Sequence, residues 1–413
     1  MVRARKDAPV ANIVDLAKKI GFTPLDESNT GDVLDFLPTF IPAIDLLLSG
    51  GIPFKRMSEV YAPEKVGKST FMIYLTRVAS VLGLPIFWVD AEGTSGKHRM
   101  QDLGVDPSKV MLFNPESLGR DKDLTVEEVA SEVEELIEAY IEHPEMDSNP
   151  MMVIWDSIGS TISQTEAETD FDKEGQRGRR AQAVTKLVNK ITPKLNKVNV
   201  AFIAINQVRA NQNMRSMYDD KWTRPGSEAL NHWESLRIEL RRGPKKTGRN
   251  HIADDSYVGH KLRLITKKNK QGLSEQEKDT YIFSEWVLRE DPPLVLDGID
   301  YPYAIYNDAT DCDLINNKGA YKEYTTLKGE TVHAYEKDII IRLHEDDDLL
   351  TDMFTQCMIK RFPVTFPAAK NKNIDIAPWP YLTKELLAYY RGEGARPDKL
   401  ITPSKPNTTK VAD

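Results

Sequence analysis

The pattern of apolar and polar positions divides the chain into segments of different character. Between residues 40 and 285, short apolar runs alternate with stretches in which apolar residues recur at helical spacing. Such alternation is typical of a mostly parallel sheet with helices on its faces. The segment is therefore expected to form an α/β core. The predicted strands are Met57–Tyr61, Pro85–Val89, Lys109–Phe113, Met151–Trp155, Val200–Ile205, Leu236–Leu240, Lys261–Thr266 and Thr280–Phe283.

One helix is especially well specified by the pattern. Thr125 and Glu128 stand at the spacing of a capping box, which satisfies backbone N–H groups at a helix N-terminus. The remaining exposed positions of this segment are mostly acidic, and we interpret them as a solvated face. The apolar residues that follow Thr125 share one helical face: Val126, Val129, Val133, Leu136, Ile137 and Tyr140.

The first 35 residues are predicted to form a small N-terminal element. Ile13, Leu16, Ala17 and Ile20 recur at helical spacing on an otherwise polar segment. One short helix cannot bury such a stripe by itself, so we expect it to pack on a neighbouring copy. Residues 1–35 are therefore assigned to oligomerisation.

Beyond residue 290 the pattern changes again. An Asp-Pro-Pro turn is followed by a hairpin-like segment, Gly319–Ala334, and by a helix around Leu349–Lys360. We expect residues 36–290 to form the core and residues 291–400 to form a separate, small α+β C-terminal domain. The polar residues 401–413 are expected to be a disordered tail.

Composition is that of a soluble globular protein. The 413 residues are 40% hydrophobic and 29% charged, and no apolar run approaches the roughly 18 residues of a membrane-spanning helix. The basic N-terminus is not followed by the apolar region of a secretion signal. The two cysteines, Cys312 and Cys357, lack a C-x-x-C arrangement, which argues against a disulfide framework or a thiolate metal site. A reducing, cytoplasmic compartment is expected.

The net charge of −8 disfavours binding to nucleic acid at first sight, because phosphates attract Lys and Arg. The charges are not mixed evenly, however. An acidic protein of this kind can still present a positive surface. Acidic residues gather in 126–142 and 344–352, whereas basic residues gather in 173–197, 209–224, 237–250 and 261–270.

A candidate phosphate-binding loop follows the first predicted strand. Residues 62–70 match the Walker A pattern, with alanine in place of its first glycine. A loop that turns from strand to helix aims backbone N–H groups at an anion, and its lysine adds a charge for the β- and γ-phosphates. The flanking elements disfavour the alternative of a chance strand–turn–helix. The residues predicted to bind ATP are Ala62, Pro63, Glu64, Lys65, Val66, Gly67, Lys68, Ser69 and Thr70, with Ser69 also a ligand of Mg²⁺.

Two further apolar strands end in acidic residues. Asp156 follows Met151–Trp155, in the position of a carboxylate that holds Mg²⁺. Glu92 follows another apolar strand and could deprotonate or orient an attacking water. Asp156 or Asp90 alone could simply cap a following helix. Together with Lys68 they indicate a site for hydrolysis of ATP with Mg²⁺.

These residues resemble the RecA family of recombinases, including its phage UvsX-like members, over residues 40–285. Ile41–Arg56 resembles the segment that leads into the family's Walker A strand, and Trp155-Asp156-Ser157 resembles its Walker B. The resemblance implies a RecA-like P-loop ATPase core. It makes Glu64 the loop glutamate and Glu92 the catalytic base.

The resemblance also assigns roles outside the loop. Ile205-Asn206-Gln207-Val208-Arg209 resembles the strand end whose glutamine senses the γ-phosphate, which makes Gln207 the sensor. Lys268-Asn269-Lys270 resembles a K-N-K element whose two lysines reach the nucleotide of the neighbouring protomer. ATP would then lie between subunits and promote an open helical polymer, because a head-to-tail contact need not close into a ring.

Two segments are expected to bind DNA. Residues 210–228 are long for an ordinary connection, and the resemblance makes them the DNA-binding loop L2. Residues 163–180 correspond to loop L1. The alternatives are a solvated flexible loop in the first case and a basic helix start without DNA in the second. The residues predicted to contact DNA are Arg177, Arg179, Arg180, Arg209, Arg215, Lys221, Trp222 and Arg224.

Some positions depart from the family. Arg99 stands where bacterial members place the tyrosine that stacks on adenine, so we expect its guanidinium plane to stack on the base. Gly226-Ser227-Glu228 replaces a Gly-Gly-Asn run at the end of L2, which makes the backbone there less permissive. The C-terminal segment resembles the family only faintly, and we assign no duplex-binding site to it.

The resemblance implies an ATP-dependent recombination and repair protein that polymerises on single-stranded DNA and catalyses homologous pairing and strand exchange. Its catalytic residues would be Glu92, Lys68, Gln207, Lys268 and Lys270. The expected partners are single-stranded and homologous duplex DNA, further copies of the chain, and a loader or single-strand-binding protein. The expected location is the nucleoid, in the host cell if the source is a phage. Two alternatives stay open. The K-N-K pair disfavours a ring-forming, helicase-like motor, and a structural filament with little turnover would not need Glu92.

Overall fold

The computed structural model describes residues 13–23, 36–93, 96–119, 123–143, 150–168, 178–210, 222–224, 227–250 and 253–362. The chain divides into two compact units, Met1–Leu34 and Asp35–Asp413. The first unit contains helix α1 (Ile13–Lys19), which confirms the predicted N-terminal helix. Its apolar residues Leu16 and Ile20 are exposed.

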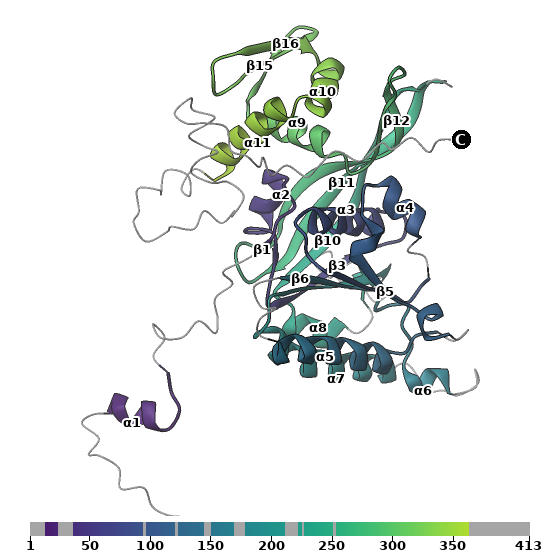
Figure 1. The fold of residues 1–413 in the computed structure, drawn as a ribbon, viewed down its shortest axis with the longest axis vertical. Coiled ribbons are helices and arrows are strands. Elements are labelled where there is room, and N and C mark those ends of the chain that lie inside the picture. Colours follow the sequence, from purple (N-terminus) through teal and green to yellow (C-terminus); the bar gives the residue numbers. More distant parts are fainter. Residues whose placement is uncertain are drawn as a thin grey trace, which may run out of the picture. The chain divides into compact units, whose positions relative to one another are not determined.

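A nine-stranded sheet forms the centre of the second unit (Figure 1). Its spatial order is β13-β12-β11-β10-β3-β7-β6-β4-β5. Neighbouring strands run parallel from β10 to β5 and antiparallel from β10 to β13. The predicted α/β sheet and each of its predicted strands are therefore confirmed. In spatial order the strands are Leu294–Gly298, Gln276–Arg289, Ala253–Asn269, Leu236–Asn250, Arg56–Ala62, Val200–Gln207, Met151–Asp156, Ile86–Asp90 and Val110–Phe113.

Strands β10, β11 and β12 extend well beyond their predicted limits. The apolar runs that predicted them cover only part of each strand, and the extension of β10, residues 241–250, is polar and rich in Lys and Arg. Lys246 pairs with Gly259 in this antiparallel ribbon. Its ammonium lies over the rings of Tyr281, Trp286 and Tyr303, which stabilise a partly buried cation. A basic strand held by aromatic rings lacks the apolar alternation that sequence-based prediction uses.

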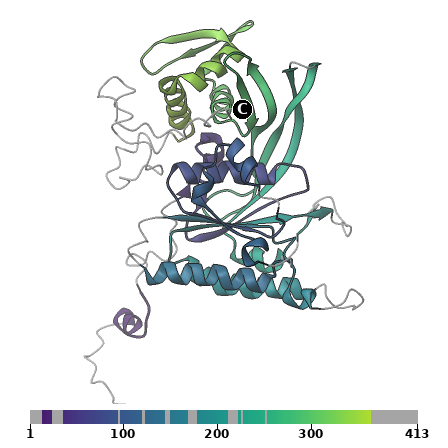
Figure 2. The same ribbon diagram turned by 45° about the vertical axis from the view of Figure 1, so that its right-hand side comes forward.

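Helices cover both faces of the sheet (Figure 2). Each face has its own cluster of buried apolar side chains, and neighbouring residues of β3 supply both, since Met57 packs in one cluster and Val60 in the other. Helices α5 (Val126–Glu142), α7 (Arg179–Leu195) and α8 (Ser227–Trp233) cover the Met57 face. Helices α2 (Pro42–Leu47), α3 (Lys68–Val81) and α4 (Lys97–Asp102) cover the Val60 face.

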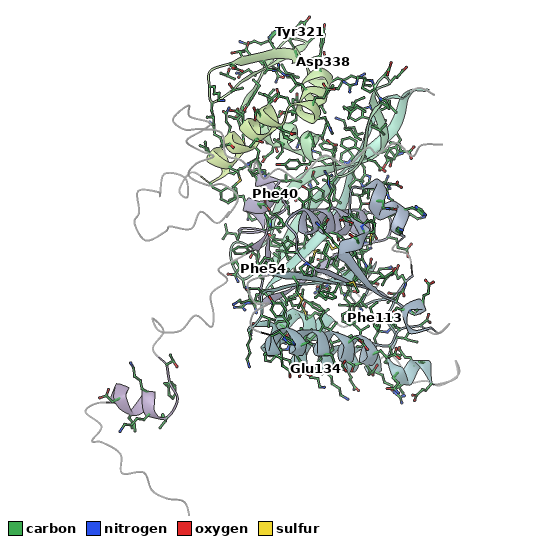
Figure 3. The ribbon with its side chains drawn as sticks, viewed as in Figure 1. Phe40, Phe54, Phe113, Glu134, Tyr321 and Asp338 are labelled. Carbon is green, nitrogen blue, oxygen red and sulfur yellow. The ribbon has the colours of Figure 1, made fainter. Side chains whose placement is uncertain are left out.

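Helix α5 begins as the sequence predicts. The backbone N–H of Thr125 donates to the Glu128 carboxylate at 2.9 Å, and the N–H of Glu128 donates to Thr125 Oγ1 at 3.2 Å. On the acidic face, Glu134, which is labelled in Figure 3, accepts hydrogen bonds from Lys190 and Lys194 of α7. The acidic face is thus partly paired with the neighbouring helix instead of being wholly solvated.

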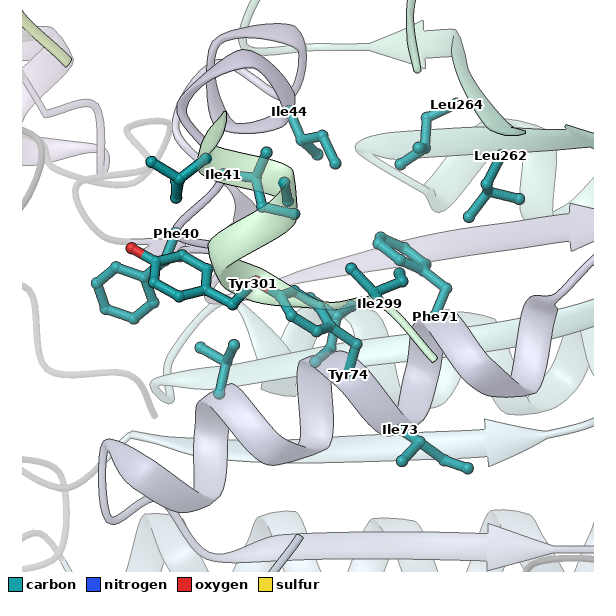
Figure 4. Close-up of a cluster of buried hydrophobic side chains, with 14 of the residues drawn as sticks. Phe40, Ile41, Ile44, Phe71, Ile73, Tyr74, Leu262, Leu264, Ile299 and Tyr301 are labelled. Atoms are coloured by element: carbon teal, nitrogen blue, oxygen red, sulfur yellow. The ribbon is translucent and has the colours of Figure 1, made fainter. Parts of the chain in front are cut away.

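The C-terminal elements pack directly on the core. Tyr301 belongs to the same buried cluster as Phe40 and as Tyr74 of α3 (Figure 4). Asp308 accepts a hydrogen bond from the backbone of Ala43 at 3.0 Å and another from Arg361. These elements form a small α+β segment with its own three-stranded sheet, and they pack on the core within the compact unit Asp35–Asp413. The elements are α9 (Tyr301–Asp311), β14 (Ile315–Lys318), β15 (Tyr321–Thr325), β16 (Thr331–Tyr335), α10 (Glu336–Glu345) and α11 (Asp347–Arg361).

Short elements complete the described part of the chain. Among its helices, none combines the length and the apolarity that crossing a membrane requires. Strand β1 (Phe36–Leu37) pairs with β2 (Ile52–Pro53), and β8 (Arg209–Ala210) pairs with β9 (Trp222–Thr223). The remaining elements are helix α6 (Gln164–Ala167) and the single turns Pro107–Lys109 and Glu116–Leu118.

Candidate phosphate-binding and hydrolysis site

The phosphate-binding loop connects the end of β3 to the start of α3. Gly67 precedes the helix with a φ of 115°, a left-handed conformation that favours glycine. A Cβ at this position would lie 2.3 Å from Cδ1 of Ile282, so the site is also crowded. The first turn of α3 contains no acidic residue, and no side chain caps it. Its backbone N–H groups are therefore available to an anion.

The side chain of Lys68 folds back on the start of this loop. Its Nζ donates to the backbone oxygens of Ala62 at 2.9 Å and of Pro63 at 3.0 Å. Burial lowers the pKa of Lys68, and the charges of Asp156 and Glu92 oppose that shift. The ammonium is thus held by carbonyl groups of the loop itself, and phosphate oxygens can replace those weaker acceptors.

Acidic residues gather at the ends of the adjacent parallel strands. Asp90 of β4 and Asp156 of β6 are register partners, and Glu92 follows β4. Burial raises the pKa of Asp156 to about 7, with further contributions from Glu92 and Asp90, while Lys68 lowers it. The site therefore carries more negative than positive charge.

A cation fits this excess charge. Within the described ranges, no group of three acidic, His or Cys side chains forms a complete metal cage. Mg²⁺ does not require one, because it usually keeps several waters and takes phosphate oxygens together with one or two protein ligands. Asp156 ends β6, and Ser69 is an exposed residue in the first turn of α3; their carboxylate and hydroxyl oxygens are of the kind that Mg²⁺ takes as ligands.

The predicted base and the predicted sensor contact each other. Gln207 ends β7 and is the register partner of Ala62, the residue at which β3 ends. The Gln207 amide donates to Glu92 Oε1 at 2.5 Å, and the Ser157 hydroxyl donates to the same oxygen at 3.0 Å. Groups at the ends of β7 and β6 thus orient the Glu92 carboxylate, which follows β4, beside the phosphate loop. The contribution of Ser157 was not expected from the sequence.

Arg99 lies on α4 and has a partner that sequence analysis missed. Its guanidinium binds both carboxylate oxygens of Asp297, at 2.5 and 3.3 Å. The next residue, Gly298, lies close to Thr70 of α3, since a Cβ there would be 3.6 Å from Thr70 Cγ2. Asp297 therefore places Arg99 near the first turn of the phosphate-binding helix. The only signal in the sequence was an Asp-Gly dipeptide, which indicates a turn and no more.

Lys268 and Lys270 do not join the phosphate loop of their own chain. Lys268 is the register partner of Arg237, which in turn pairs with Glu59 and not with the loop end of β3. The two ammonium groups donate to backbone oxygens of α8, on the face of the sheet opposite α3. Burial, together with Lys270, lowers the pKa of Lys268 to about 8.

The predicted DNA-binding residues have varied surroundings. Arg177, Arg215 and Lys221 lie outside the described residues, and Arg179 opens α7. Arg180 donates to the Gly159 oxygen at 2.7 Å and pairs with Glu166. The backbone of Arg209 pairs with Thr223, and Trp222 is partly buried.

Arg224 has surroundings that its sequence context did not indicate. Its side chain is only 5% exposed and forms an ion pair with the buried Glu59. Its guanidinium donates to Glu59 and to Asn231. The basic character of the surrounding sequence could not reveal that one of its arginines turns inward.

The fold and the site together identify the class of protein. A strand–loop–helix phosphate site beside acidic strand ends of a parallel sheet belongs to the P-loop nucleotide-binding α/β proteins. The family model described as the RecA N-terminal domain matches residues 18–285, which is more than half of the chain. The chain belongs to the RecA family.

Several curated relatives carry the name Protein RecA. The one from Thermotoga petrophila is 27% identical over 309 residues, which cover 74% of this chain and 76% of that protein. The one from Thermus aquaticus is 28% identical over 251 residues, covering 60% and 67%. One from Thermus thermophilus is 25% identical over 340 residues, covering 82% and 89%.

Proposed function

We propose that this chain is an ATP-dependent recombinase that assembles on single-stranded DNA and catalyses homologous pairing and strand exchange. Membership of the RecA family supports the general activity. The observation that carries the proposal is the contact of Gln207 and Ser157 with Glu92 beside the phosphate loop. A nucleotide-binding protein without turnover has no need for an oriented carboxylate at this point.

The chemistry follows from the positions of these groups. The first turn of α3 and Lys68 bind the phosphates, and the whole loop from Ala62 to Thr70 surrounds them. Glu92 accepts the proton of the attacking water, and Gln207 positions that water or the γ-phosphate. Ser69 and Asp156 would hold Mg²⁺, which would supply positive charge beside the phosphate oxygens. Arg99, fixed by Asp297, stacks on the base.

Self-association completes the site. Lys268 and Lys270 lie away from their own phosphate loop, and the resemblance of the K-N-K element assigns them to the nucleotide of a neighbouring copy. Such a head-to-tail contact generates an open helix unless its rotation closes a ring. The exposed apolar stripe of α1 is suited to pack on another copy. ATP binding then promotes assembly, and hydrolysis reverses it.

The DNA partners are single-stranded DNA and a homologous duplex. Loop segments near 163–180 and 210–228 surround the strand, with Arg179 and Trp222 among the contacts. A loader or a single-strand-binding protein is a further expected partner.

Electron microscopy with single-stranded DNA and a slowly hydrolysed ATP analogue tests the proposal. We expect open helical filaments, and DNA-stimulated ATP hydrolysis in a parallel assay. A closed ring would instead support a helicase-like motor of the same fold. Filaments without DNA-stimulated turnover would support a structural role.

A further inference from the structure

A buried cluster of polar side chains lies beside the base of the loop 210–228. We call it the Glu59 junction and define it by Glu59, Asn206, Arg224, Asn231 and Arg237. Glu59 is fully buried in β3 and pairs with both Arg224 and Arg237. Asn206 of β7 donates to its other oxygen at 2.9 Å. Asn231 of α8 accepts hydrogen bonds from the two arginines.

A second carboxylate holds the same loop end. Trp222 Nε1 donates to Glu239 of β10 at 3.2 Å, and the Tyr61 hydroxyl donates to the other oxygen of Glu239 at 3.4 Å. The Arg224 guanidinium lies 5.0 Å from the ring centre of Tyr61. Both Glu59 and Tyr61 belong to β3, the strand that ends in the phosphate loop. The returning end of the loop is therefore fixed to that strand at two adjacent points.

The Glu59 junction also adjoins residues that the proposed function assigns to two nucleotide sites. Asn206 directly precedes Gln207, which binds Glu92 of the same chain. On the other side, Lys268 donates to the backbone oxygen of Asn231. If Lys268 serves the nucleotide of a neighbouring copy, it must leave that oxygen when the nucleotide is present. A change at the chain's own nucleotide reaches Asn206, which binds Glu59, and a change at the neighbour's nucleotide reaches Asn231. Glu59 and Asn231 both bind Arg224.

We propose that Arg224 is a positioning residue that sets the conformation of the DNA-binding loop according to the nucleotide state, and that it does not contact DNA. This inference rests on the proposed function, because it assigns a control element to the same DNA loop. Movement of Gln207 shifts Asn206 on Glu59, and Glu59 transmits the shift to Arg224. The ion pair is suited to this task because its burial fixes one geometry and makes displacement costly. Two discrete arrangements of such a network are what coupling between sites requires.

Binding of an oligo-dT strand to the full chain tests this assignment. The affinity is measured with a non-hydrolysable ATP analogue and with ADP, each over a series of salt concentrations. In Arg224→Gln we expect the ratio of the two affinities to fall about tenfold, a typical size for coupling between sites. The salt dependence should not change, because no phosphate contact is lost. The matched control is Arg56→Gln, which lies on β3 like Glu59 and donates to Asn196 at 2.9 Å, outside the Glu59 junction.

Two results would overturn the assignment. A salt slope reduced by about 0.7 with an unchanged affinity ratio would make Arg224 an ordinary phosphate contact. An equal loss of affinity in both nucleotide states would leave it a purely structural role. If Arg224→Gln fails to fold, Asn206→Ala keeps all charges and tests the same link, with the same expected loss of the affinity ratio. A wild-type chain whose DNA affinity ignores the nucleotide would instead refute the proposed function itself.

Discussion

Two groups of acidic residues in the same sheet have opposite surroundings. Asp90, Glu92 and Asp156 gather at adjacent strand ends, and the cation that opposes their effect on Asp156 is Lys68. Glu59, in the middle of β3, is bound by two arginines and an amide. The carboxylates of the first group repel one another, whereas the charge of Glu59, the second group, is neutralised by its arginine partners.

The difference in charge balance distinguishes carboxylates of a ligand-binding site from a carboxylate with a structural role. Burial, together with repulsion by Glu92 and Asp90, raises the pKa of Asp156 to about 7, and an incoming cation relieves that unfavourable energy. The charge of Glu59 is already matched, so a ligand would gain nothing there and removal of a partner would be costly. The charge balance around a carboxylate thus tells more about its role than its burial, since Asp156 and Glu59 are both buried. Substitutions in each group can break or sharpen this comparison.

The largest effect is expected from Lys68→Ala, which removes the cation opposing the first group. Nucleotide affinity should fall about 100-fold or more, because the phosphates lose a charge-assisted contact in a site that is already too negative. Titration with a fluorescent ATP analogue measures the loss. Lys190→Ala, on the far helical face, is the control and should bind normally. Unchanged affinity in Lys68→Ala would remove this loop from the nucleotide site.

Glu92→Gln removes one acid from the first group without changing its shape. DNA-stimulated hydrolysis should fall by about 10²- to 10⁴-fold, the usual contribution of a general base, while filaments still form. A phosphate-release assay and microscopy report the two properties. Glu132→Gln, at an exposed position of α5, should retain full activity. Normal hydrolysis in Glu92→Gln would place the base elsewhere.

Glu59→Gln breaks the neutralised group. We expect a loss of about 3 kcal/mol in the free energy of unfolding, because Arg224 keeps its buried charge without a carboxylate, whereas Arg237 still pairs with Glu234. Urea denaturation of the nucleotide-free chain measures it. The control is Glu345→Gln, which breaks the more exposed pair with Arg289 and should cost at most about 1 kcal/mol. A loss no larger than the control's would remove the contrast between the two groups.

Asp156→Asn should change the free energy of unfolding in the opposite direction from Glu59→Gln, and by a smaller amount. Relief of repulsion should stabilise the nucleotide-free chain by about 1 kcal/mol, as often happens when a binding site gives up its charge. The folded wild type keeps the Asp156 proton up to a pKa of about 7, whereas its ordinary pKa is 3.8. Wild-type stability therefore falls as pH rises between those values, and the gain in the variant should grow over the same range. A variant that is less stable than wild type at pH 8 would contradict this.

The sheet and the phosphate site could be predicted because their signals are local. A strand followed by a glycine-containing loop and a helix places Lys68, and acidic residues directly after apolar strands place Asp156 and Glu92. Parallel strands then bring their ends to one edge without further information. The contact between Gln207 and Glu92 follows from the same geometry.

What could not be predicted depends on partners distant in sequence. Arg224 lies in a basic segment that favours DNA, yet its partner Glu59 is far away along the chain. Asp297, which holds Arg99, likewise comes from a strand with no distinctive pattern. The extensions of β10 and β11 lack apolar alternation because their pairing and the rings around Lys246 replace it.

The continuity of the buried cluster from α2 to α11 bears on how the chain can be shortened. The family match ends at residue 285, but Phe40 and Ile44 pack in the same cluster as Tyr301 and Met358. A truncation at the end of the match would strip cover from apolar side chains of the matched part itself. Such a fragment would tend to aggregate. The residues beyond 285 are therefore needed to keep the ATPase core in solution.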